Sequence, residues 1–171
     1  MTTIVCACGA VCLEAIDPPM MTVICHCTSC RTAGRAFDAR SPVASIVDIA
    51  GGTAAVLWRR DRARCVLGGD QLVAHRLTPK APSRRMIAAC CGTPMFGDFI
   101  KGFWVSIYRG RVTDAPAPSM RVMMIDAPDG AAFPDDGVPR YRSRPGKFLV
   151  KLLTTWAATE FRNPRLVGVP D

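Results

Sequence analysis

The sequence predicts a mainly β fold that is closed by one C-terminal amphipathic helix. Three observations support this prediction. Short apolar segments bounded by turn residues fill the first two thirds of the chain. Cysteines recur at Cys-x-Cys spacing, which is typical of metal-binding loops between strands. Near the end of the chain, the apolar residues change to a helical spacing.

Seven apolar segments of strand length can be placed in order along the chain. They are residues 10–16, 21–25, 54–58, 63–67, 72–77, 86–89 and 103–108. Proline and glycine pairs separate several of them and favour turns, as at 17–19, 51–52 and 68–70. Between the second and third strands, residues 28–34 are expected to form a single helical turn.

The last third of the chain begins with a segment rich in proline, aspartate and glycine, residues 114–139. This composition predicts a linker or a loop wrapped over the surface. After it, a helix is predicted from apolar residues at helical spacing, with Pro145 near its start and Asn163-Pro164 beyond its end. The apolar residues are Phe148, Leu149, Leu152, Leu153 and Trp156. We therefore divide the chain into a β domain at 1–113 and a wrapped segment with the helix at 114–171.

Composition narrows the class of protein. The 171 residues suit one domain, and 49% hydrophobic with 21% charged residues is ordinary for a globular protein. We expect no membrane segment, and the N-terminus lacks the pattern of a secretory signal, which favours the cytoplasm. The formal charge of +8 comes mostly from arginines. Acidic and apolar residues interrupt the groups of arginines. We therefore interpret the arginines as solvated surface residues or as charges that attract a small anionic substrate, rather than as a nucleic-acid-binding surface.

Cys25, Cys27 and Cys30 place three thiols within six residues, directly after an apolar strand. A local bend can bring such thiols to the separation of about 3.8 Å expected when two of them bind one zinc ion. Disulfides fit less well, because thiols this crowded strain the bond geometry and the chain has an odd total of nine cysteines. The spacing predicts a zinc site with three protein ligands and one open position.

A second cysteine set joins distant parts of the chain. Cys6 and Cys8 precede Gly9, and Cys90 and Cys91 precede Gly92. Together the four thiols would suit a closed structural zinc site, which brings the predicted total to two zinc ions. The alternative is that Cys6 and Cys8 are core residues on one face of a strand. Four other residues are expected to lie outside the metal sites: Cys12, Cys65, His26 and His75.

The order of these motifs resembles a known family. Cys6-Ala7-Cys8-Gly9, then Cys25-His26-Cys27-Thr28-Ser29-Cys30, then Cys91-Gly92-Thr93-Pro94, are similar to the motifs of glutathione-dependent formaldehyde-activating enzymes, a family that includes centromere protein V. The resemblance covers roughly residues 4–110. It implies coiled β-sheets, a structural zinc with four thiolates, and a second zinc at Cys25, Cys27 and Cys30 that serves carbon–sulfur lyase chemistry with glutathione.

One position departs from the family pattern. The resemblance leads us to expect a zinc ligand where Ala88 stands, and Cys90 is the nearby residue that would replace it. Arg31 or Arg35 would offset the negative charge of the open site and bind a substrate carboxylate. Two functions remain open at this stage. The chain is either an enzyme that acts on the thiol adduct of a small aldehyde, or a non-catalytic zinc-stabilised module that binds a protein or a small ligand.

Overall fold

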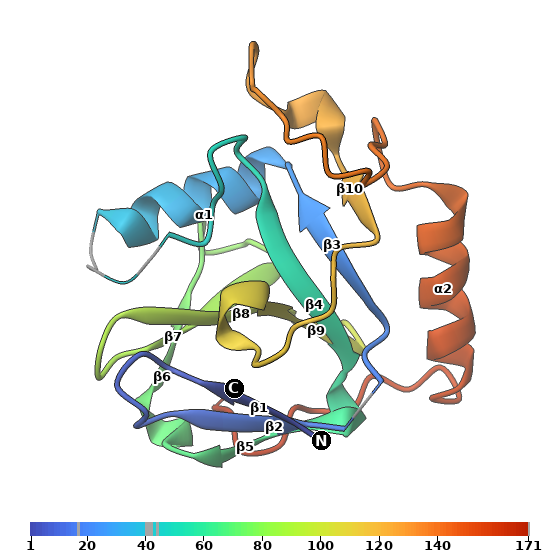
Figure 1. Ribbon diagram of the computed structural model, residues 1–171. Helices are drawn as coiled ribbons and strands as arrows, with labels where there is room; N and C mark the ends of the chain where they lie inside the picture. Colours follow the sequence, from blue (N-terminus) through green and yellow to red (C-terminus); the bar gives the residue numbers. More distant parts are fainter. Residues whose placement is uncertain (17, 40–42, 44, 171) are drawn as a thin grey trace.

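The computed structural model describes residues 1–171 except 17, 40–42, 44 and 171. In the described part of the chain, two sheets and two α-helices form the fold (Figure 1). The strands are β1 Thr2–Val5, β2 Cys12–Ala15, β3 Met21–Cys25, β4 Thr53–Arg59, β5 Ala63–Leu67, β6 Leu72–His75, β7 Ser83–Ala88, β8 Thr93–Phe99, β9 Trp104–Tyr108 and β10 Met120–Val122. The α-helices are α1 Thr28–Asp38 and α2 Gly146–Ala157. Four 3-10 turns are η1 Arg60–Arg62, η2 Gly69–Gln71, η3 Arg109–Arg111 and η4 Met124–Asp126.

The mainly β fold class is confirmed, and each of the seven predicted segments contains or overlaps a strand. A small sheet has the order β1-β2-β5, and a large sheet has the order β10-β3-β4-β9-β8-β7-β6. All neighbouring strands are antiparallel except β10, which pairs in parallel with β3 at the edge of the large sheet. Because β10 comes from the proline-rich part of the chain, residues beyond 114 contribute to the main sheet. The predicted domain division at residue 113 stays a prediction.

The main hydrophobic core lies between the two sheets. Ile4 and Leu13 from the small sheet pack with Trp58, Phe96 and Ile107 from the large one, and all five are almost fully buried. The alternation of side chains along each strand accounts for this arrangement, since every second residue of β4 and β9 points into the core. The opposite face of the large sheet is therefore available to the helices.

Helix α1 is longer than expected. The sequence predicts one turn over residues 28–34, whereas the helix continues to Asp38. Gly34 does not end it, because this residue lies where the helix packs tightly against the following loop. A Cβ atom at Gly34 would be 2.1 Å from the Val47 Cγ2 atom, so only glycine fits there. The helix buries Phe37, whose ring packs edge-on against His75 of β6.

Helix α2 covers the β3–β4 part of the large sheet, beside which it stands in Figure 1. Phe148 is buried, Leu152 is half-buried, and Trp156 stacks on Phe103. Leu149 and Leu153 also belong to the predicted apolar face, but both are more than half exposed. Neither α1 nor α2 has both the length and the apolar composition that a membrane crossing requires within the described residues.

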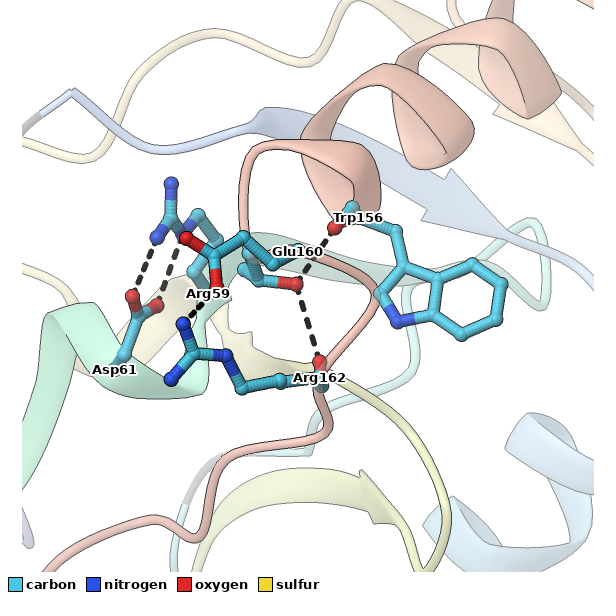
Figure 2. A network of polar contacts seen from close by, with 6 residues as sticks. Arg59, Asp61, Trp156, Glu160 and Arg162 are labelled. Carbon is cyan, nitrogen blue, oxygen red and sulfur yellow. Dashed lines mark hydrogen bonds and ion pairs between the residues drawn. The ribbon is translucent and has the colours of Figure 1, made fainter.

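The end of α2 is held by local polar contacts, which Figure 2 shows from close by. The Thr159 hydroxyl donates a hydrogen bond of 2.7 Å to the carbonyl oxygen of Trp156. Glu160 and Arg162 form an exposed ion pair next to a second one between Arg59 and Asp61. Exposed pairs of this kind contribute little to stability, so the packing of Phe148 and Trp156 must hold the helix in place.

The segment between β10 and α2 wraps over the end of the large sheet near α1. Its anchor is Arg121, which is almost fully buried and forms a bidentate ion pair with Asp136 at 2.8 Å for both contacts. The backbone of Tyr141 adds a hydrogen bond to the Arg121 carbonyl oxygen. Phe133, from the same segment, packs edge-on against His26. These contacts fix the wrapped segment beside the cysteines that follow β3.

Candidate metal centres

The structure brings Cys6, Cys8, Cys90 and Cys91 together, and we name them the four-cysteine cluster. Their sulfur atoms all lie within 4.8 Å of one another. Cys8 is 3.3 Å from Cys90 and 3.5 Å from Cys6, and Cys90 is 3.9 Å from Cys6 and 3.8 Å from Cys91. None of the four is in a disulfide bond.

Two turns form this cluster. In the first, the chain reverses between β1 and β2, with Gly9 in the left-handed region at a φ of 78°. In the second, β7 ends at Ala88, and the amide of Gly92 donates a hydrogen bond of 2.8 Å to the Ala88 carbonyl oxygen. Gly92 also has a positive φ, of 70°. Glycine reaches this conformation at little cost, so both turns can fold back and present their thiols to one point.

Two of these sulfur atoms lie within hydrogen-bonding distance of polar groups of the chain. The amide of Val11 donates to the Cys6 sulfur at 3.2 Å, and the Thr93 hydroxyl lies 2.9 Å from the Cys91 sulfur. Burial alone raises the pKa of Cys91, but hydrogen bonds from Thr93 and the backbone outweigh it and lower that pKa to about 6. Donors of this kind stabilise thiolates, which are the form that binds a metal.

Cys25, Cys27 and Cys30 form a second group, which we name the three-cysteine cluster. Cys25 ends β3, Cys27 is the residue before α1, and Cys30 lies in the first turn of that helix. All three are half-buried. No histidine, aspartate or glutamate among the described residues joins this group closely enough to act as a fourth ligand.

The electrostatics of the three-cysteine cluster favour negative charge at Cys27. Hydrogen bonds with Cys25 and Cys30 lower the pKa of Cys27. The contact with Cys27 raises the pKa of Cys25, and contacts with Cys25 and then Cys27 raise the pKa of Cys30. Cys27 also lies at the N-terminus of α1, where the exposed amides favour an anion. Arg144, from the wrapped segment, lowers the pKa of Cys27 further through its charge.

Two polar residues near this cluster could not be found from the sequence. Arg85 of β7 reaches α1, where it donates hydrogen bonds to the hydroxyl and the carbonyl oxygen of Ser29. Tyr108 of β9 lies close enough to Cys30 and Arg85 for both to act on it. Burial and then the Cys30 charge raise the pKa of Tyr108, and Arg85 opposes them. Arg85 and Tyr108 are far from the cysteines in the sequence and match no motif.

Both groups have the donor chemistry and the spacing that zinc requires. Thiolates bind zinc at about 2.3 Å in a tetrahedral arrangement, which separates the sulfur atoms by about 3.8 Å. The separations of 3.3–3.9 Å in the four-cysteine cluster match this value, and the three-cysteine cluster is equally compact within 4.8 Å. The two clusters could therefore each hold a metal ion, for which zinc is the natural choice.

Comparison with known proteins identifies the family. The family model described as "Glutathione-dependent formaldehyde-activating enzyme" matches residues 1–123. The chain belongs to this family. A solved Rhodobacter sphaeroides protein, a structural genomics target, is 17% identical, with a TM-score of 0.46 over 81% of this chain and 99% of its own. Among curated proteins, none matches this chain.

In this member of the formaldehyde-activating family, the structure shows what the departure at position 88 involves. Ala88 ends β7 and is fully buried in the core between the sheets. Cys90 is exposed and lies against Cys8 instead. The chain bends at Cys90-Cys91, so adjacent thiols can approach the same point.

The remaining cysteines and histidines lie outside both clusters. Cys12 and Cys65 sit on the neighbouring strands β2 and β5 and are half-buried, and burial is the main cause that raises the pKa of each. His26 is fully buried against Phe133 and belongs to neither cluster. His75 packs on Phe37 beneath α1.

Proposed function

We propose that this chain is a two-zinc protein whose four-cysteine cluster is structural and whose three-cysteine cluster binds a small thiol such as glutathione. The observation that supports the proposal is the difference between the two groups. One offers four thiols, which close a tetrahedral site, and the other offers three among the described residues. Structural zinc sites normally have four protein ligands, and catalytic ones keep one position for water or substrate.

The proposed reaction is that of a carbon–sulfur lyase acting on the thiol adduct of a small aldehyde. In the forward direction of adduct formation, the thiol sulfur bonds to the carbonyl carbon and the thiol proton ends on the carbonyl oxygen. A zinc ion at Cys25, Cys27 and Cys30 would supply stabilisation of the substrate sulfur as a thiolate near neutral pH. The reverse direction breaks the same carbon–sulfur bond and releases thiol and aldehyde.

Residues of the chain itself would do the rest of the work. Cys27 and Cys30 start α1, so the rigid helix sets their spacing, and Cys25 is held by the pairing of β3 with β4 and β10. Arg144 is exposed and adds positive charge near Cys27, which would attract an anionic thiol. The roles expected for Arg31 and Arg35 stay predictions.

The metal content is the first test. Protein purified without a chelator is expected to contain two zinc ions per chain, because there are two compact thiol clusters. Elemental analysis against protein concentration measures this directly. Cys27→Ala should retain one zinc, and Cys65→Ala, a control outside both clusters, should retain two. Absence of zinc from the wild-type protein would refute the proposal.

Thiol binding is the second test, and it separates an enzyme-like site from a binding module with two structural ions. In the cobalt-substituted protein, glutathione is expected to change the thiolate charge-transfer band, since its sulfur would bind at the open position. S-methylglutathione has no free thiol and is the matched control, so it should leave the spectrum unchanged. A spectrum unaffected by millimolar glutathione would favour the non-catalytic module.

A further inference from the structure

Among the described residues, Arg85 is a buried cation without an acidic partner. Its exposed fraction is 6%, and no carboxylate pairs with it within the described part of the chain. The other two buried arginines differ in this respect, because Arg60 pairs with Asp98 and Arg121 pairs with Asp136. A charge taken out of water is costly unless an opposite charge or several hydrogen bonds compensate it. The environment of Arg85 must therefore compensate its charge in another way.

The strand register places Arg85 on the same face of the large sheet as the three-cysteine cluster. Arg85 lies opposite Gly97, and Gly97 lies opposite Ser106, which shares a face of β9 with Tyr108. Cys25 lies opposite Thr53 of β4. Two residues later, Ala55 lies opposite Tyr108, so Cys25 and Tyr108 are on the same face of the sheet. Gly97 has no side chain, which leaves room above the sheet between Arg85 and Tyr108.

The contacts of Arg85 point to the cluster from the helix side. Its guanidinium donates hydrogen bonds to the hydroxyl and the carbonyl oxygen of Ser29, which lies between Cys27 and Cys30 in the first turn of α1. It also donates a hydrogen bond of 3.3 Å to the Ser83 hydroxyl of its own strand, and it interacts with the hydroxyl of Tyr108. Serine and tyrosine hydroxyls orient a guanidinium but do not neutralise it. Cys30 and Arg85 both act on Tyr108, so the charge of the cluster and that of Arg85 meet around this side chain.

We propose that Arg85 is a positioning residue of the three-cysteine cluster. Its charge compensates the thiolates of Cys25, Cys27 and Cys30, and its hydrogen bonds to Ser29 fix the helical turn that carries two of them. The inference rests on the proposed function, in which three thiolates and one divalent ion leave a net charge of −1, and a bound substrate thiolate makes it −2. A fixed positive charge nearby favours both the metal-bound state and the entry of the thiolate.

The test compares cobalt affinities of the two clusters in variants of Arg85, measured by competition with a chelator. Arg85→Gln is expected to weaken binding at the three-cysteine cluster about 10- to 100-fold, the range for residues that support metal ligands. Arg85→Lys retains the charge and should lose less, although it cannot reproduce the planar hydrogen bonds. The four-cysteine cluster should be unaffected. Arg62→Gln removes an exposed arginine and is the control, with wild-type affinity at both clusters.

Each alternative result has a distinct meaning. A folded Arg85→Gln protein with unchanged cobalt affinity would refute the inference, and so would an equal loss at both clusters, which indicates a general structural role. If Arg85→Gln does not fold, Ser29→Ala decides instead. It removes the hydroxyl that holds the guanidinium, so a severalfold weaker affinity is expected and an unchanged one contradicts the inference. A wild-type protein that binds only one cobalt would overturn the proposed function as well.

The same variants should affect the thiol. In Arg85→Gln protein saturated with cobalt at both clusters, the glutathione concentration that half-changes the spectrum is expected to rise about tenfold or more, with partial recovery in Arg85→Lys. Wild-type protein that binds two cobalt ions but no glutathione would contradict the proposed function. The role of Arg85 would then be decided by the cobalt affinities alone. If all variants bind glutathione with equal affinity, Arg85 does not act as a counter-charge for the thiolate. Its role would then be limited to holding α1 in place.

Discussion

Cys8→Ala is expected to destabilise the protein far more than Cys27→Ala does. Cys8 is exposed, so its side chain contributes little to the core, and the loss would report almost entirely on the metal. A structural zinc contributes on the order of 10 kcal/mol to small zinc-stabilised domains, which sets the upper limit of the effect. The four-cysteine cluster also joins segments about 80 residues apart, so its loss frees the β1–β2 turn from the β7–β8 turn.

Cys27→Ala provides the contrast, because the three ligands of the three-cysteine cluster all come from one short segment. Losing that metal frees the start of α1 but leaves the pairing of β3 with β4 intact. Urea denaturation followed by circular dichroism, with zinc content measured on the same samples, tests this difference. Cys12→Ala controls for loss of a thiol outside the clusters. Equal destabilisation by Cys8→Ala and Cys27→Ala would contradict the assignment of a structural and an open site.

Asp98→Asn is expected to lower the free energy of unfolding by about 3–5 kcal/mol, the usual cost of removing one partner of a buried ion pair. Asp98 of β8 is 3% exposed and pairs with Arg60, which is also buried, and with Arg84 at 3.1 Å. Arg60 in turn donates hydrogen bonds to the carbonyl oxygens of Phe99 and Pro164. Asparagine keeps the shape but removes the charge, so it leaves two arginines without compensation.

The matched control is Asp61→Asn, which removes an acidic partner of Arg59 at the surface. Exposed pairs are worth about 0–1 kcal/mol, so this change should have little effect on unfolding by urea. Zinc content should stay at the wild-type value in both variants, since Asp98 contacts neither cluster. A loss of less than about 1 kcal/mol in Asp98→Asn would show that the buried arginines are solvated or paired in another way.

Within the described chain, the sequence predicts seven of the strands and misses β1, β8 and β10. β8 contains Pro94, Gly97 and Asp98, none of which favours a strand. The structure accommodates Pro94 next to an irregularity in the pairing of β7 with β8, and Asp98 beside two arginines. β1 and β10 were also missed, because β1 has only Ile4 and Val5 as apolar residues and β10 lies in the proline-rich segment interpreted as a linker or loop. Long-range pairing decides these three strands.

Some residues of the candidate sites could be grouped from the sequence, and others could not. Cys25, Cys27 and Cys30 could be grouped from the sequence because a six-residue span allows few separations between their thiols. The approach of Cys6 and Cys8 to Cys90 and Cys91 could be expected only from their motifs, since nothing local brings two turns together. Arg85 and Tyr108 gave no signal, because an arginine or a tyrosine in a strand is most often a surface or core residue.

By itself, then, the sequence determined the mainly β class, the C-terminal helix and the local grouping of thiols within each motif. These features depend on periodicity and on spacings of a few residues, which the backbone geometry translates directly into structure. The tertiary structure decided which turns meet, that Cys90 lies in the cluster while Ala88 lies in the core, and that Arg85 contacts Ser29 between two of the three cysteines. Alternation along a strand specifies only two faces, and the register with distant strands and the packing of α1 determine what each face meets.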